Sequence, residues 1–495
     1  MKRRLFIWSI ISAVLILLFT TRSSVLFVCN NWDDANSYFT MGKGMMHGLV
    51  IYRDLYDQKG PFLYLLYGLA YLISEKTFFG VFIFEIIAAT FFLYFAGRVI
   101  ERRSNEVLAL ILVPVLSACV YSSWSFYFGG GAEEFCLPFF AYSMYALDLI
   151  LHKEFDEKLI AKRMAFVALC AGVTAQVKYT MLGFYVAWFV IVFIWIAIKK
   201  DIVFALKQTL KFILFALIPS IPWMIYFLAT GSLDDWFRCY IYNNIFHYSQ
   251  VTTEEYSFFT KLYEMSKTLY WLIRDSFSYF ILIIAGLILQ LVLEKGFIRR
   301  FTSLFIFGVT YFVIFIGGNK LAYYSIPLMA LAIPGISYIA ELLVRVFGNL
   351  KEKKIGVVPV VIMLGVLAIS TVFAANNTMN AEYRGFSKED VWLVDAAKYL
   401  TKDDTLLELN AIDAGLYTVT GIVPTCEYFQ TNGLDLETMF IEQKKYLKEG
   451  RTDYVLAVGF EPEFIHEHYS LMAVYDYNET HHEETYYLYR RNDHG

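Results

Sequence analysis

The sequence predicts an all-α polytopic membrane bundle that is followed by a small extracytoplasmic α/β domain. Of the 495 residues, 58% are hydrophobic and only 18% are charged. Apolar runs of about 18 residues or more recur along the chain, as in multi-spanning helical membrane proteins. After residue 375 these runs stop, and short strand patterns alternate with helical ones. We therefore expect a transmembrane part at 1–375 and an α/β domain at 376–495.

Apolar segments of about the 20 residues that a spanning helix needs occur at eleven places. They lie at 5–28, 78–99, 105–121, 134–151, 163–177, 180–198, 208–229, 270–293, 301–317, 321–341 and 355–375. The first begins like a signal peptide, but its apolar run continues to Phe27 without a small-residue cleavage site. We therefore expect an uncleaved first span.

Lys and Arg gather in every second connection between these segments. The basic connections hold Arg98, Arg102 and Arg103, then Lys153, Lys158, Lys162 and Arg163, then Lys199, Lys200 and Lys207, then Lys295, Arg299 and Arg300, then Arg345, Lys351, Lys353 and Lys354. By the positive-inside rule these connections are cytoplasmic. The sequence thus predicts a multi-pass plasma-membrane protein with a cytoplasmic N-terminus, and it places loop 29–77 and the C-terminal domain outside.

The C-terminal domain shows helix and strand patterns in alternation. Helices are expected at 387–404 and 434–450, and strands at 405–410, 453–460 and 485–491. Such alternation indicates a small α/β domain.

The first outer loop, 29–77, is crowded with charge. Between residues 33 and 59 its charged side chains and its one histidine are Asp33, Asp34, Lys43, His47, Arg53, Asp54, Asp57 and Lys59. A helical stripe of Tyr38, Met41, Met45 and Leu49 predicts a helix lying at the membrane surface. Residues 61–73 are apolar but too short to cross and begin with Pro, which predicts a second, interfacial helix.

The types of charge in this loop suit transfer chemistry at the membrane surface. A single carboxylate here would ordinarily be a solvated charge. Asp33 and Asp34, however, stand where the surface helix begins, and the helix dipole favours their ionised form. An ionised carboxylate can act as a general base. Arg53 and Lys59 offer cations for a lipid phosphate at headgroup depth.

Three short motifs resemble those of the GT-C membrane glycosyltransferases, in particular the bacterial relatives of protein O-mannosyltransferase and of the lipid A aminoarabinose transferase. The first combines the acidic loop start with "G-x-x-x-YRD" and "QKGP-x-LY". The second is "AGVTAQVKYTMLGF", and the third is "GGNKLAYYSIPLMALAIP". Ala322 departs from the pattern, because many relatives carry His there.

The resemblance implies a GT-C bundle of about eleven transmembrane helices with its catalytic loop at 29–77. It implies transfer, with inversion, of a sugar from a polyprenyl-phosphate donor to a glycolipid, a cell-envelope polysaccharide or a protein on the outer face. Asp34 matches the family's base, and Asp33 is the alternative. Arg53, Lys59 and Lys178 would hold the donor phosphate. The remaining cavity candidates are Glu134, Tyr52, Tyr323, Tyr324 and His247.

Several of these residues have a structural alternative. Lys178 needs a partner or ligand if it lies at bilayer depth, but at the end of a span it would only snorkel. Glu85, within the second span, is expected to pair with a neighbouring helix. No His or Cys spacing forms a ligand set, so the sequence identifies no certain cofactor. A divalent ion near the acidic loop is compatible with the family resemblance.

Two other classes of protein compete with the transferase. A transporter or flippase of lipid-linked saccharides would also use charged groups in an aromatic cavity, but such proteins usually place charge within the spans and show internal repeats. A membrane-anchored sensor would leave the charged loop unexplained. Nucleic-acid binding is not expected, because no basic patch stands clear of the membrane. The sequence does not specify the sugar or the acceptor.

Overall fold

The computed structural model describes residues 2–247, 257–317, 320–347, 356–431, 436–479 and 482–493. The chain forms two compact units. The helical unit comprises Met1–Ser24, Phe82–Pro222 and Glu255–Ala381, and the mixed unit comprises Val25–Val81, Trp223–Glu254 and Glu382–Gly495. In this clustering the first loop groups with the C-terminal residues, and the domains at 1–375 and 376–495 stay a prediction.

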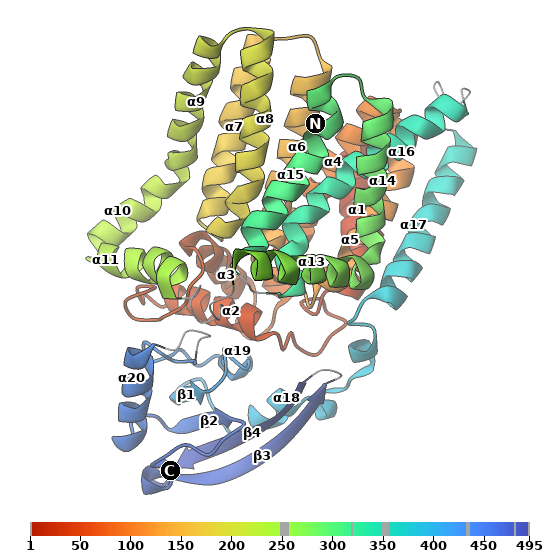
Figure 1. Cartoon of the computed structure of the whole chain (residues 1–495). Coiled ribbons are helices and arrows are strands. Elements are labelled where there is room, and N and C mark those ends of the chain that lie inside the picture. The colour runs from red at the N-terminus through yellow and green to blue at the C-terminus, as the bar shows by residue number, and fades with distance from the viewer. Residues whose placement is uncertain are drawn as a thin grey trace. The chain divides into compact units, whose positions relative to one another are not determined.

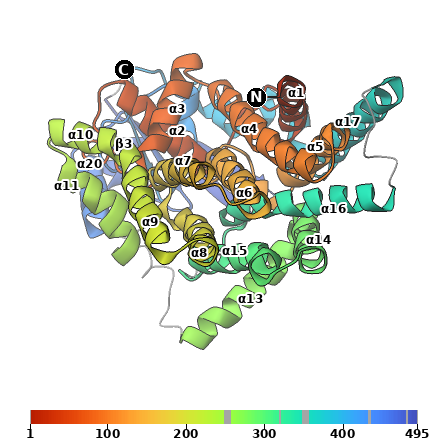
Figure 2. The same cartoon turned by 90° about the horizontal axis from the view of Figure 1, so that it is seen from above.

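The helical unit consists mainly of long helices that lie side by side, except that Phe258–Asp275 runs across the others (Figures 1 and 2). They are α1 (Arg3–Thr20), α4 (Phe79–Arg103), α5 (Glu106–Tyr121), α6 (Leu137–His152), α7 (Glu157–Ala175), α8 (Leu182–Lys199), α9 (Ile202–Leu217), α13 (Phe258–Asp275), α14 (Phe277–Leu293), α15 (Phe297–Phe315), α16 (Ala332–Val346) and α17 (Val357–Asn377). A 3₁₀ segment, Ala322–Leu331, precedes α16.

Every predicted span coincides with helix, which confirms a mostly helical multi-pass membrane protein. Among the described residues, eight helices are long and apolar enough to cross a membrane, or nine if the bent pair α13–α14 is one span. Helix α5 has only 16 residues. The first two turns of helix α7 carry four charged residues, Glu157, Lys158, Lys162 and Arg163. With the bent pair counted as one span, α5 and α7 account for the difference between the predicted eleven spans and these nine.

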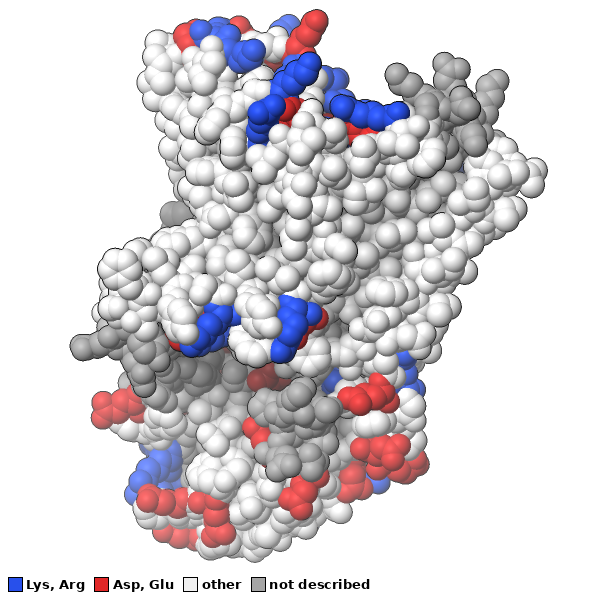
Figure 3. Space-filling view, turned by 45° about the vertical axis from the view of Figure 1, so that its right-hand side comes forward, with Lys and Arg blue, Asp and Glu red and all other residues white. Residues whose placement is uncertain are grey.

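The outer flank of the helical unit is suited to lipid. Only 11% of the apolar window in Ile202–Ala229 and 22% of that in Val357–Asn377 is buried. On the face in Figure 3, the middle of the helical unit is almost all uncharged, and charged side chains, most of them Lys and Arg, gather at its upper end. Exposed apolar helix faces of this extent are stable in hydrocarbon but not in water.

Two predicted spans have wrong boundaries. Helix α1 ends at Thr20 instead of residue 28, because the chain turns where Arg22 is buried and donates to Asn380 Oδ1 at 2.8 Å. The segment 270–293 is not one straight helix: α13 and α14 meet at 109° at Ser276. Polar and aromatic residues are interleaved along α13, and the uninterrupted apolar run begins only in α14.

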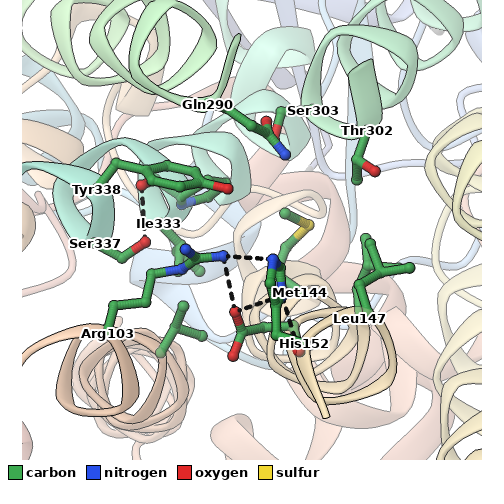
Figure 4. A pocket seen from close by; sticks show the side chains of 14 residues that line it. Arg103, Met144, Leu147, His152, Gln290, Thr302, Ser303, Ile333, Ser337 and Tyr338 are labelled. Atoms are coloured by element: carbon green, nitrogen blue, oxygen red, sulfur yellow. Dashed lines mark hydrogen bonds and ion pairs between the residues drawn. The ribbon is translucent and has the colours of Figure 1, made fainter. Parts of the chain in front are cut away.

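A buried ionic network joins helices α4, α6, α14 and α16 at one end of the helical unit. Arg103 lies 3.1 Å from Asp148, 3.2 Å from the carboxylate following α14, Glu294, and 3.0 Å from Glu341. His152 lies 2.9 Å from the same Glu294 oxygen. Figure 4 shows Arg103 and His152 pointing toward each other beneath Tyr338, whose hydroxyl donates to Glu294 at 2.9 Å. Arg103, which the sequence analysis used to predict the orientation of the chain in the membrane, therefore also joins these helices.

The mixed unit contains short helices and one sheet. Its elements are α2 (Asp33–Met46), α3 (Pro61–Ile73), most of α10 (Ile221–Ala229), α11 (Leu233–Trp236), a π-helix at Phe237–His247, α18 (Trp392–Ala396), β1 (Leu406–Leu409), α19 (Leu416–Thr420), α20 (Glu437–Lys448), β2 (Tyr454–Val458), α21 (Ile465–His468), β3 (Tyr469–Glu479) and β4 (His482–Arg491).

The sheet confirms the predicted α/β character of the tail. Its strand order is β1-β2-β4-β3, with β1 parallel to β2 and the other neighbours antiparallel. The three predicted strands and the helix at α20 are present. The prediction missed β3, the hairpin partner of β4. The helix expected at 387–404 is reduced to a turn and the five residues of α18.

Helix α2 is not the surface helix that its apolar stripe predicted. Residues 34–44 are buried, with α3 on one side and the C-terminal segments on another. Leu49 of the predicted stripe lies beyond the helix end. A side chain on Gly42 would lie 2.4 Å from the backbone nitrogen of Gly68, so the close crossing of α2 and α3 requires glycine.

Candidate functional site

Asp34 and Lys59 meet in the mixed unit. Asp34 stands in the first turn of α2 and is largely buried, and its Oδ1 atom lies 3.5 Å from Nζ of Lys59. Lys59 Nζ also lies 5.4 Å from the ring centre of Tyr38. The structure therefore brings together a residue predicted to be the base and a residue predicted to bind phosphate.

The turn 52–59 is built to present Lys59. Tyr52 has a positive φ of 71°, which is uncommon for a bulky residue, and it is fully buried. Its hydroxyl donates to the carbonyl of Lys59 at 2.5 Å, and the N–H of Lys59 donates to the hydroxyl of Tyr64 at 2.8 Å. Tyr52 thus positions the loop backbone, and its predicted place in a cavity stays a prediction.

A third carboxylate, which the sequence analysis did not single out, lies beside Lys59. Asp57 is buried, and its Oδ2 atom accepts a hydrogen bond from Tyr64 at 2.8 Å. Burial raises the pKa of Asp57, while the charge of Lys59 lowers it. The only signal for this contact in the sequence is that Asp57 and Lys59 stand just before the predicted helix that starts at Pro61 and carries Tyr64.

Asp33 differs from its neighbour in environment. Its side chain reaches solvent but is crowded by protein atoms, and its Oδ1 atom accepts a hydrogen bond from the N–H of Asp34 at 2.7 Å. Loss of hydration and the adjacent charge of Asp34 raise the pKa of Asp33 to about 7. Near neutral pH the two aspartates therefore need not carry the same charge.

The side chain of Arg53 is held by Asp54 and Thr230. Its guanidinium forms a two-point ion pair with Asp54, at 2.8 and 3.0 Å, and donates to the carbonyl of Thr230 at 3.0 Å. The paired guanidinium lowers the pKa of Asp54. A role for Arg53 at a phosphate would require this pair to open.

The π-helix Phe237–His247 holds the same turn. Asn244 donates to the carbonyl of Gln58 at 2.8 Å, and Asn243 donates to the hydroxyl of Tyr56 at 3.1 Å. His247 is exposed at its end, with its ring 5.6 Å from that of Tyr242. This π-helix thus supports the loop that carries Lys59.

A buried charge cluster joins α2 to the tail within the mixed unit. Lys43 is fully buried and donates to the carbonyl of Tyr417 at 2.5 Å, while Thr40 donates to Asp413 at 2.5 Å. Burial lowers the pKa of Lys43 to about 7 and raises that of Asp413 to about 6, and the charges of Asp413 and Glu408 oppose the shift at Lys43. The helix carrying Asp34 is therefore fixed to the C-terminal segments by charge as well as by packing.

The remaining predicted site residues lie in the helical unit. Lys178 pairs with Glu133 at 2.5 Å and lies 3.5 Å from the ring centre of Tyr324 and 5.8 Å from that of Tyr323. Lys178 thus has a carboxylate partner, as a charge at bilayer depth requires. The sequence analysis named Glu134 as a cavity candidate, but the carboxylate that contacts Lys178 is its neighbour Glu133.

Glu134 occupies a different environment from Glu133. Its Oε2 atom accepts a hydrogen bond from the N–H of Gly130 at 3.0 Å. Glu85 accepts one from Thr21 at 2.8 Å, which is the pairing with a neighbouring segment that the sequence predicted for it. Both carboxylates are buried in the helical unit.

The chain offers no complete metal site in its described ranges. No group of three or more His, Cys, Asp or Glu side chains lies close enough together to bind an ion there. Dependence on a divalent ion stays a prediction of the family resemblance.

Solved structures with this architecture include a lipid-modifying enzyme and an oligosaccharyltransferase. The chain superposes on ArnT from Cupriavidus metallidurans bound to undecaprenyl phosphate with a TM-score of 0.62 and 13% identity, covering 97% of this chain and 98% of that one. The apo state of the same protein gives 0.60 at 12% identity over 97% of each chain. The Archaeoglobus fulgidus oligosaccharyltransferase tethered with an acceptor peptide gives 0.51 at 13% identity, over 92% of this chain and 69% of that one.

At the level of sequence no family model matches the chain. No curated protein matches it either. The structural matches nevertheless extend over nearly the whole chain, so the protein has the GT-C fold. The expected fold class, a helical membrane bundle with a small C-terminal α/β part, is thereby confirmed.

Proposed function

We propose that the protein is a glycosyltransferase that transfers a sugar from a polyprenyl-phosphate-linked donor to an acceptor on the outer face of the membrane. The acceptor would be a glycolipid, a cell-envelope polysaccharide or a protein. The observation that carries the proposal is the 3.5 Å contact between Asp34 and Lys59 in a chain with the GT-C fold. ArnT of the same fold was solved with undecaprenyl phosphate bound, which supports a lipid phosphate as part of the donor.

The proposed mechanism divides two tasks between these residues. The carboxylate of Asp34 removes the proton of the acceptor hydroxyl or amine as that atom attacks the anomeric carbon from the face opposite the phosphate, which inverts the configuration. The lipid phosphate leaves as a stable anion, so no strong general acid is needed. Lys59, and with it Lys178 and Arg53, would stabilise the charge that grows on the phosphate.

The environments of the two aspartates favour Asp34 as the base. The cation of Lys59 beside Asp34 stabilises an ionised carboxylate. The pKa of Asp33, raised to about 7 by desolvation and the charge of Asp34, leaves Asp33 protonated over much of the range below neutral pH. Asp33 would then limit the negative charge facing the donor.

The proposed orientation follows the distribution of basic residues, with the N-terminus cytoplasmic and the C-terminal domain extracytoplasmic in the plasma membrane. A flippase or transporter remains the second candidate function. The buried Glu85 and the partly buried Lys178 and Arg103 of the helical unit weaken the sequence argument that charge gathers only in the loop.

Incubation with a panel of polyprenyl-phosphate sugars separates the two functions. Purified protein in lipid nanodiscs should release polyprenyl phosphate from at least one donor when an acceptor extract is present. A transporter would move the lipid across proteoliposomes without consuming it. Movement without release would contradict the transferase.

A further inference from the structure

The helical unit contains a cavity of about 330 Å³ to which no role is assigned above. Its lining comes from three places: the connection between α5 and α6, the bend between α13 and α14, and the start of the 3₁₀ segment Ala322–Leu331. The volume falls within the range of about 300–1,000 Å³ that is usual for small-ligand sites. The cavity is large enough for a single sugar ring.

Aromatic rings form the walls of this cavity. Trp124, Tyr127, Trp271 and Tyr323 all line it. Tyr127 has a positive φ of 60°, so the backbone stores strain where it presents this ring. The rings of Tyr127 and Tyr323 lie 5.8 Å apart, and the guanidinium of Arg274 lies 4.0 Å from the ring centre of Trp271.

The floor is fixed by a buried cluster of hydroxyl groups. Ser276 lines the cavity, and its Oγ atom lies 2.7 Å from Oγ of Ser125. Ser325 donates to Ser125 at 2.8 Å, and the hydroxyl of Tyr279 lies 2.9 Å from Ser325. This cluster ties together the three segments that supply the walls, so their relative positions are set before any ligand binds.

Charged groups complete the lining. Lys320 pairs with Glu264 at 2.6 Å and Asp275 pairs with Arg274 at 2.6 Å, and Lys320 and Asp275 both line the cavity. They place a hydrogen-bond donor and an acceptor beside apolar ring faces. An isoprenoid chain alone has no polar group that could form a hydrogen bond with Lys320 or Asp275.

We propose that this cavity binds a pyranose ring of the donor or of the acceptor. A pyranose has C–H faces that pack on flat aromatic rings and hydroxyl groups that bond to carboxylate and ammonium groups at its edge, and the cavity supplies both. Tyr323 also lies near Lys178, whose Nζ is 5.8 Å from its ring centre. The ring would thus sit beside a cation predicted to hold the lipid phosphate. The inference rests on the proposed function for the source of the sugar.

Binding of simple glycosides tests this site without turnover. The full-length protein in nanodiscs is titrated with the methyl glycosides of glucose, galactose, mannose and N-acetylglucosamine, with saturation-transfer NMR as the readout. We expect at least one to bind, and Trp271→Ala to weaken that binding about tenfold or more. Phe259→Ala is the matched control, because it removes another exposed aromatic of α13, 80% accessible, that does not line the cavity.

A competition experiment decides whether the bound pyranose corresponds to the donor sugar or to the acceptor. A polyprenyl-phosphate sugar that displaces the glycoside assigns the cavity to the donor sugar, and simultaneous binding assigns it to the acceptor. No binding of any glycoside in the panel, or equal binding by Trp271→Ala and the wild type, overturns the proposal. Glycoside binding in a protein that releases no polyprenyl phosphate would refute the transferase and leave this carbohydrate site standing.

Discussion

Lys59 Nζ lies 3.5 Å from Oδ1 of Asp34, although 25 residues separate them in the chain. The contact depends on two devices in the mixed unit: the crossing of α2 and α3 at Gly42 and Gly68, and the strained turn at Tyr52. This ion pair holds the base proposed for transfer beside a cation proposed to bind the donor phosphate. The following predictions test that arrangement and the networks that hold it.

Asp34→Asn should abolish transfer without preventing folding. Removing a general base typically lowers a rate about 10²–10⁴-fold. Initial rates with a saturating donor measure the effect, and the midpoint of thermal unfolding monitors integrity. Asp33→Asn is the matched control and should lose less than Asp34→Asn. The opposite order would transfer the role of base to Asp33.

Lys59→Ala should weaken donor binding more than acceptor binding. A charge-assisted hydrogen bond is worth about 1.5–3 kcal/mol, so the donor Kd should rise about 10–100-fold. Arg53→Ala should have a smaller effect, because Arg53 is already engaged by Asp54 and the Thr230 carbonyl. Calorimetric titration with undecaprenyl phosphate measures both variants. Equal affinities of Lys59→Ala and the wild type would contradict the assignment.

Donor affinity should fall as pH rises through about 7. Asp33 has a pKa raised to about 7 and is therefore neutral below this value and anionic above it. The groups that face it are Asp34, Lys59 and Glu484. Ionisation adds a negative charge near the donor phosphate and raises the donor KM. In Asp33→Asn this pH dependence should disappear, and an unchanged profile would exclude Asp33 as its source.

Lys43→Met should destabilise the mixed unit strongly. The change leaves the buried carbonyl of Tyr417 without its donor, which costs about 1–3 kcal/mol, and it removes the cation that faces the buried carboxyls of Asp413 and Glu408. The double variant Lys43→Met/Asp413→Asn should recover part of the loss. Thermal unfolding followed by tryptophan fluorescence measures the shift. Lys76→Met, at an exposed position of the same unit, should change it by less than about 0.5 kcal/mol.

Arg103→Gln should destabilise the helical unit by about 3–5 kcal/mol. The change leaves Asp148, Glu294 and Glu341 facing one another with one cation fewer. Arg345→Gln is the control, because Arg345 is exposed and contacts only the outer side of Glu341. Similar unfolding midpoints for the two variants would show that the network of Figure 4 carries little stability.

The sequence by itself determined the class of fold. Hydrophobic length identifies helices that must satisfy their own backbone hydrogen bonds in lipid, so the positions of α4, α8 and α17 follow from local composition. Short runs rich in apolar and aromatic residues likewise located β1, β2 and β4. Strand β3 escaped because its partly polar pattern becomes a strand only through pairing with β4.

Only the tertiary structure decided which charges meet. The apolar stripe of α2 predicted a surface helix, but Lys43, Thr40 and Asn36 on its other faces bond to the tail and bury it. The partner of Lys178 proved to be Glu133, 45 residues away. Such long-range pairs depend on how helices cross, and crossing is set by close contacts such as Gly42 on Gly68, which leave no periodic signal in the sequence.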